Sequence, residues 1–228
     1  TIIDRPSDVG LAIDGARQRK SADTTPSPAS PIPNHSFSEV LSGRNFWLSA
    51  LGMTALVAVL TTVLANLSLF ATDLGVTRER AAVLISIFAL IGLFASPVIG
   101  RLCDVFEIRW LFSAMLLFCL VATMVIIAAD SYQHLIIATC LVAVAGGGLT
   151  PFWSALIGQL YPIELYARAM GSMALVTGAA GAAAPFLAGW TFDISGSYRL
   201  LFQTLIALMV IALAAIPLIQ AKAPSLRN

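Results

Sequence analysis

Charged residues are scarce in this sequence. Of its 228 residues only 11% are charged, with 13 Lys and Arg against 12 Asp and Glu, whereas 58% are hydrophobic. Soluble domains carry about a quarter of charged residues, so a soluble globular protein is excluded. Cysteine is scarce as well. Cys103, Cys119 and Cys140 lie within or beside apolar runs, which gives no basis for a disulfide framework.

The few charged residues leave six long uncharged runs between them. The runs cover residues 45–72, 81–100, 110–129, 131–163, 169–192 and 200–221. A helix needs about 20 apolar residues to cross the hydrocarbon core of a bilayer, and each run is long enough for one crossing. The runs are continuously apolar and lack the alternation that is typical of membrane β-barrel strands. The sequence therefore predicts an all-α membrane protein with six transmembrane helices.

These runs also set the expected domain boundaries. We expect a membrane domain over residues 45–221, with spans at about 46–72, 81–100, 110–129, 134–161, 169–191 and 200–220. Residues 1–44 include the stretch SADTTPSPASPIPNHS, which is typical of a disordered linker. Residues 222–228 form a short tail. The chain begins with TIIDRPSDVG and not with Met, so we expect a longer polypeptide.

The basic residues are unevenly divided between the two sides of the predicted spans. Ten of the 13 Lys and Arg residues lie on the side of the two termini, and three lie on the other side. Short loops rich in Lys and Arg stay in the cytoplasm. Both termini are therefore predicted to be cytoplasmic, in a multi-pass protein of a bacterial inner membrane.

The loop between the second and third runs carries a recognisable motif. GRLCDVFEIRW, residues 100–110, resembles the G-x-L-x-D-R-x-G-R-[RK] loop of the major facilitator superfamily, with matches at Gly100, Leu102, Asp104 and Arg109 and differences at positions 105, 107 and 108. RPSDVGLAIDG resembles the loop that follows the sixth helix of that family. PIELYARAMG and GWTFDISGSYR resemble the entry to the eleventh helix and its exit. The four stretches occur in the family's order and cover nearly the whole chain.

The resemblance implies helices seven to twelve of a twelve-helix secondary transporter. In such transporters, two three-helix inverted repeats surround a site near the bilayer midplane. The resemblance also implies a cytoplasmic gate that comprises Gly100, Arg101, Asp104, Arg109, Glu164 and Arg168. Asp104, just past a helix end, is expected to accept hydrogen bonds from the N-terminal amides of a neighbouring helix and to pair with Arg101 or Arg109. The resemblance implies that this gate holds the outward-open state. The alternative is a solvated loop whose arginines only set the membrane topology.

Polar side chains on two of the predicted helices suggest a substrate path. At 100° per residue, Thr61, Ser68 and Thr72 of the first span fall within about 40° of Thr54. In the fourth span, Thr139, Gly146, Thr150 and Trp153 likewise fall within about 40° of one line. The predicted path residues are Thr54, Thr61, Asn66, Ser68, Thr150, Trp153 and Ser154. The alternative for each hydroxyl is a hydrogen bond between packed helices.

Glycine clusters in two of the spans. The fourth span contains AGGGLTP, with Gly146, Gly147, Gly148 and Pro151. Such a sequence leaves backbone hydrogen-bonding groups within the membrane without their helical partners. A membrane tolerates this only against protein or a water-filled cavity, so we predict a hinge at the path. The fifth span, GSMALVTGAAGAAAPFLAG, predicts close helix approach, with sliding during transport as the alternative.

Ionisable residues are absent from the spans, and this limits the possible chemistry. No Asp, Glu, Lys or Arg falls inside a span, and the two histidines lie in the linker and at an outer boundary. No catalytic set, metal site or cofactor site is therefore expected. Residues 95–100 resemble the A-R-P-x-x-G stretch of monocarboxylate-type facilitators, but Ser96 replaces its arginine. A path with a neutral lining is predicted.

We therefore predict a secondary carrier of small organic solutes, organic acids included. Its expected partners are the solute, the lipid bilayer and an N-terminal six-helix half of the same protein, and no nucleic acid. Any charge that binds substrate or couples transport to protons would come from that other half. Uptake and efflux both stay open. The alternative function is a self-contained six-span channel or membrane scaffold that acts as an oligomer.

Overall fold

The structure is a computed structural model that describes residues 40–195 and 199–219. Most of the predicted linker, residues 1–39, and the predicted tail, residues 222–228, lie outside the described residues. All described helices belong to one compact unit within His35–Asn228.

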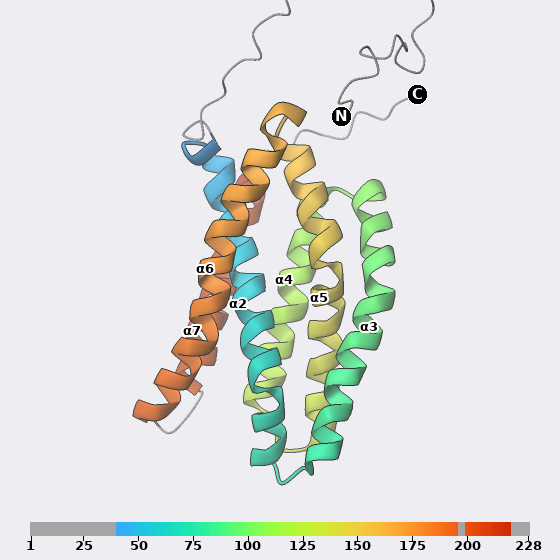
Figure 1. The fold of residues 1–228 in the computed structure, drawn as a ribbon, viewed down its shortest axis with the longest axis vertical. Helices are drawn as coiled ribbons and strands as arrows, with labels where there is room; N and C mark the ends of the chain where they lie inside the picture. Colours follow the sequence, from blue (N-terminus) through green and yellow to red (C-terminus); the bar gives the residue numbers. More distant parts are fainter. Residues whose placement is uncertain (1–39, 196–198, 220–228) are drawn as a thin grey trace, which may run out of the picture. The chain divides into compact units, whose positions relative to one another are not determined.

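Six long helices make up the described part of the chain (Figure 1). They are α2 (Arg44–Asp73), α3 (Arg78–Val105), α4 (Ile108–Ile127), α5 (Tyr132–Leu160), α6 (Ile163–Ser195) and α7 (Arg199–Ala215), and the short 3₁₀ helix η2 (Ile216–Leu218) follows. Each of the six is long and apolar enough to cross a membrane. No strand occurs among residues 40–195 and 199–219. The prediction of an all-α membrane protein with six helices is confirmed.

Several helices extend beyond the predicted spans. α6 begins at Ile163 and so includes Glu164 and Arg168, although the predicted span begins at residue 169. Charged residues limit the length that can lie in hydrocarbon, but a helix satisfies its own backbone hydrogen bonds and can continue into water. For the same reason α3 continues to Val105, and Asp104 lies within its last turn. The expectation that Asp104 follows the helix end was wrong.

The last helix is shorter than predicted. α7 ends at Ala215, whereas the predicted span reaches residue 220. Pro217 lies in the 3₁₀ helix that follows. Proline lacks the N–H that an α-helix needs at an interior position, which explains why the α-helical pattern stops here.

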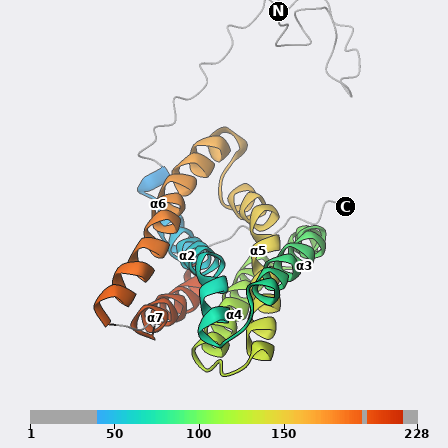
Figure 2. The same cartoon turned by 60° about the horizontal axis from the view of Figure 1, so that its bottom comes forward.

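Two central helices organise the packing. α2 contacts each of the other five helices, most extensively α6, and α5 packs against both α3 and α4. Figure 2 shows α6 and α3 on opposite sides of the bundle. In the most apolar 18-residue stretch of each helix, 61% of α2 is buried inside the protein but only 11% of α3. α2 therefore lies in the interior of the bundle, whereas α3 packs mainly along one side of α5.

Aromatic side chains fill the interior between the helices. Phe46 of α2, Phe112 of α4 and Phe152 of α5 are all fully buried. The ring centroids of Phe112 and Phe152 are 5.0 Å apart, within the range of favourable aromatic pairs. This contact joins α4 to α5 and fixes the frame that carries the candidate site.

Candidate functional site

The predicted polar stripe of α2 lies on a face that is only partly covered. Thr54 and Thr61 are half-buried and Ser68 is exposed. The Thr61 hydroxyl donates a hydrogen bond to the carbonyl of Val57 at 2.9 Å. A Cβ atom built on Gly181 of α6 would lie 3.7 Å from the Thr61 methyl group. Thr61 therefore packs beside α6 with its hydrogen bond made inside its own helix, and Ser68 stays open.

Asn66 lies inside the bundle. The side chain is 8% exposed, and its amide donates to the carbonyl of Thr62 at 2.8 Å. The hydroxyl of Thr62 is fully buried and has no hydrogen-bond partner in the described part of the chain. Because an unmade buried hydrogen bond costs about 1–3 kcal/mol, the Thr62 hydroxyl is a candidate partner for a buried water. It lies off the predicted stripe, and no sequence signal marks it.

The polar residues of α5 differ in their hydrogen bonding. Thr150 is exposed, and Ser154 donates to the Thr150 carbonyl at 3.2 Å. The Trp153 ring is partly buried, and its indole N–H is enclosed without an acceptor among the described residues. The buried hydroxyl of Thr139 is also unpaired there. Because a buried indole N–H usually has a partner, Trp153 offers a donor that the described chain does not use.

The glycine run of α5 packs closely against α3. A Cβ atom on Gly147 would overlap the backbone of Gly92, and one on Gly148 would lie 2.6 Å from the Ile99 side chain. Glycine allows this close approach of two helices because it has no side chain. The run therefore contributes to helix packing as well as to any hinge.

The predicted hinge lies in a continuous helix. α5 is helical from Tyr132 to Leu160, with Pro151 inside it. A Cβ atom built on Gly100 of α3 would lie 3.6 Å from Cβ of Pro151. The two stretches that the sequence singled out, residues 95–100 and 146–151, therefore face each other. A hinge at these positions stays a prediction.

The loop after α3 is held by a different ion pair from the expected one. Arg109 pairs with Glu107, and its guanidinium also donates to the carbonyl of Ile219 at 3.4 Å. Asp104 is exposed and has no ion pair within residues 40–195 and 199–219. The expected pairing of Asp104 with Arg101 or Arg109 is therefore not found here. Glu107 lies just before α4 and is closer to Arg109 in the chain than Asp104 is. It forms the ion pair with the Arg109 side chain.

The other predicted gate residues lie on separate helices. Arg101 is exposed near the end of α3, and Glu164 and Arg168 are exposed on the first turns of α6. In the described part of the chain α3 and α6 do not contact each other. The chain itself therefore does not assemble the two groups into one gate.

Three neutral polar groups of α2 and α5 are enclosed without a hydrogen-bond partner in the described part of the chain. They are the indole N–H of Trp153 and the hydroxyls of Thr62 and Thr139. Within the described ranges, no three His, Cys, Asp or Glu side chains gather where they could hold a metal ion. Thr139 and Trp153 lie 14 residues apart on α5, about 21 Å at 1.5 Å per residue, so these groups do not form one binding site.

Comparison with known proteins gives one family. The family model described as Major Facilitator Superfamily matches residues 18–227. An MFS-type efflux pump, MMF1 of Mycosarcoma maydis, is 27% identical over 183 residues, which are 78% of this chain and 30% of the pump. The uncharacterized transporter YebQ of Escherichia coli is 28% identical over 159 residues, which are 69% of this chain and 35% of that protein.

Mouse monocarboxylate transporter 2 shows a similar degree of likeness. It is 24% identical over 163 residues, which are 70% of this chain and 34% of the transporter. The chain therefore spans about a third of the length of the curated relatives that it matches.

Proposed function

The chain belongs to the major facilitator superfamily, and from this premise we propose that it is the C-terminal six-helix half of a secondary carrier for small organic solutes. The observation that carries the proposal is the match of a transporter family to residues 18–227, over a chain with six membrane-spanning helices. Two three-helix inverted repeats, α2–α4 and α5–α7, would alternate access to a site between this half and an N-terminal half. Both termini would lie in the cytoplasm of a bacterial cell.

The proposed solute path runs along α2 and α5, mostly on their partly open faces, with Asn66 buried behind the face of α2. Thr54, Thr61, Asn66 and Ser68 would contribute from α2, and α5 would contribute Thr150, Trp153 and Ser154. A solute with carbonyl, carboxyl or hydroxyl oxygens fits this set, because the unused indole N–H of Trp153 needs an acceptor. The relatives include an efflux pump and a monocarboxylate transporter, so organic acids belong in the first panel of solutes.

The proposed cytoplasmic gate would be completed by the other half. Arg101, Asp104, Glu164 and Arg168 are all exposed. Asp104 near the end of α3 would accept hydrogen bonds from a helix N-terminus of that half, where the dipole favours an anion by ~0.3–1 kcal/mol. Gly100 would let α5 approach α3 closely. Residues 146–148 and Pro151 would form the hinge at which α5 bends during transport.

The proposal is tested by transport in proteoliposomes that contain the whole product of the gene. Uptake and efflux of a panel of labelled organic acids and neutral polar solutes would be measured with and without a proton gradient. We expect saturable flux of at least one solute, and the gradient arm separates proton-coupled transport from facilitated exchange. Failure of every solute in both directions would contradict the proposal.

A single substitution tests the path in the same assay. Trp153→Phe keeps the ring and removes only the N–H donor, so we expect the apparent KM to rise about five- to tenfold with kcat nearly unchanged. Trp110→Phe is the matched control, because Trp110 is 73% exposed on α4. Equal KM values for the two variants would show that Trp153 packs against its neighbours and does not bind the solute.

A further inference from the structure

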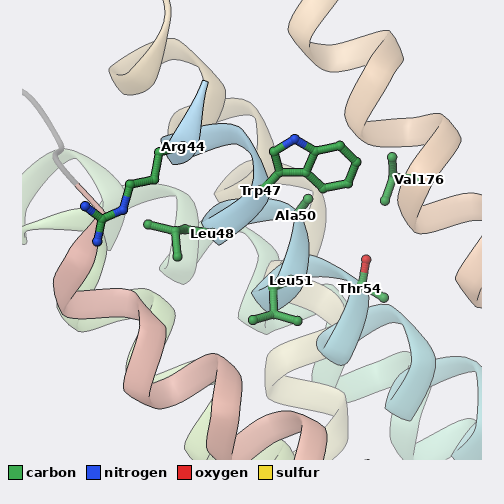
Figure 3. Close-up of a pocket in the computed structure, with 7 residues that line it drawn as sticks. All are labelled: Arg44, Trp47, Leu48, Ala50, Leu51, Thr54 and Val176. Atoms are coloured by element: carbon green, nitrogen blue, oxygen red, sulfur yellow. The ribbon is translucent and has the colours of Figure 1, made fainter. Parts of the chain in front are cut away.

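An apolar groove of about 570 Å³ runs along the first turns of α2. Its lining consists of Arg44, Trp47, Leu48, Ala50, Leu51 and Thr54 of α2 together with Val176 of α6 (Figure 3). Figure 3 shows the Trp47 ring turned toward α6, whereas Arg44 points to the other side of α2. The Trp47 indole N–H donates to the carbonyl of Leu41 at 2.7 Å, and the residue is 54% exposed. The groove therefore offers an open hydrocarbon surface in which Trp47 is held by its hydrogen bond. Arg44 lies at one end of the groove, with its guanidinium on the other side of α2 from Trp47.

A second hollow, of about 310 Å³, shares Arg44 with this groove. The other residues that line it are Gly43, Asn45, Leu160, Tyr161 and Leu218. The Tyr161 hydroxyl is enclosed and has no hydrogen-bond partner in the described ranges. A tyrosine hydroxyl has an ordinary pKa of about 10, so this group is a protonated donor at neutral pH.

The start of α2 adds further positive character to the second hollow. The residue before the helix, Gly43, supplies no side-chain cap, and the first turn holds no acidic residue. The first backbone N–H groups of a helix carry partial positive charge and favour anions. Among the described residues, no acidic side chain lines either hollow. α3 begins in a similar way with Arg78, but Glu79 lies in its first turn.

We propose that the start of α2 binds an anionic phospholipid. The headgroup phosphate would lie between the Arg44 guanidinium and the Tyr161 hydroxyl, and one acyl chain would lie in the groove along Trp47 and Leu51. The argument is charge and polarity complementarity, because a hydrocarbon surface and a donor-lined hollow meet at one arginine at the end of a membrane-spanning helix. A soluble anion would use the hollow and leave the groove unoccupied. This site shares Thr54 with the α2 side of the proposed solute path and includes no residue of α5 from that path.

The proposal is tested with the whole gene product in lipid nanodiscs. Fluorescence quenching by brominated phosphatidylglycerol and brominated phosphatidylcholine is compared, and the Trp47→Phe variant supplies the signal from the other tryptophans. We expect preferential quenching of Trp47 by the anionic lipid. Arg44→Gln should lower that preference about fivefold, the effect of about one basic residue near an anionic surface, and Tyr161→Phe should lower it less.

Matched variants and a soluble probe make the test decisive. Arg78→Gln removes the same charge from the start of α3 and should leave the preference unchanged. Arg44→Lys keeps the charge and should retain most of the preference, which covers the case that Arg44→Gln fails to fold. Equal quenching by both lipids, or a preference that survives Arg44→Gln, would overturn the proposal. Addition of inorganic phosphate should leave most of the preference, because the groove holds the acyl chain of a lipid and no part of a soluble anion.

Discussion

The glycines of α5 and those of α6 look alike in the sequence but have different surroundings. In α5, Gly147 lies so close to Gly92 of α3 that a Cβ atom would overlap the backbone. In α6, Gly171, Gly178 and Gly189 have no other atoms within 4 Å of such a Cβ. The glycines of the α5 run therefore pack against other helices of this chain, whereas most glycines of α6 have no neighbour there.

The open glycines of α6 form one face together with larger side chains. Spaced three or four residues apart, the exposed positions of this face are Gly171, Leu175, Gly178, Ala182, Phe186 and Gly189. Residues with this spacing lie on one side of a helix. An exposed apolar helix face of this kind can pack against another helix or face lipid. In the proposed carrier we expect the N-terminal half to cover it.

The largest expected effect is that of Gly147→Ala. The added methyl group meets the backbone of Gly92, which cannot move aside as a side chain can. Overpacking of this kind costs typically 1–3 kcal/mol, and we expect the upper end, with a fall in the melting temperature on the order of 5–10 °C. Thermal unfolding of the detergent-solubilised protein, followed by tryptophan fluorescence, measures the change.

The control for this prediction comes from the other helix. Gly178→Ala adds the same methyl group where no atom lies within 4 Å, so its melting temperature should stay close to that of the unmodified protein. If the two variants melt alike, the contrast between α5 and α6 does not hold.

Gly178→Leu sharpens the comparison further by adding bulk to the open face of α6. Within this chain the side chain has free space, so stability should change little. If the other half covers this face, however, solute flux in proteoliposomes should fall about tenfold, because about 1.4 kcal/mol of misfit corresponds to that factor. Flux that is unchanged would show that α6 faces lipid at this level.

Gly146→Ala should give the smaller effect of the two alanine substitutions at packed glycines of α5. Here the nearest atom to the added methyl group is the tip of the Phe88 ring, at 2.8 Å. A ring tip can shift by a few tenths of an ångström, so we expect a cost of about 1 kcal/mol. The same unfolding assay should place this variant between Gly178→Ala and Gly147→Ala. A loss as large as that of Gly147→Ala would mean that the Phe88 ring cannot move.

The number of membrane helices could be predicted because each helix depends only on the length and apolar character of its own run of residues. A run of about 20 residues without charge can cross a bilayer whatever surrounds it, and this property identified all six helices. The helix ends could not be predicted so well, because Glu164 and Arg168 are excluded from hydrocarbon but not from a helix.

The candidate site was harder to predict because its details depend on contacts across the chain. The pairing of Arg109 with Glu107 and Ile219 requires the end of α7 to lie beside the start of α4. The unpaired hydroxyl of Thr62 depends on which neighbours enclose it. The contact between Gly147 and Gly92 joins two helices that the sequence shows only as separate runs.

Solute counterflow tests the central claim, that this chain is half of an alternating-access carrier, most directly. Proteoliposomes with the whole gene product are loaded with a high concentration of unlabelled solute, and entry of the same labelled solute is followed over time. A carrier returns with bound solute, so the account predicts that labelled solute accumulates transiently above its external concentration. Entry that is unsaturable and never exceeds the external concentration would indicate a channel and contradict the account.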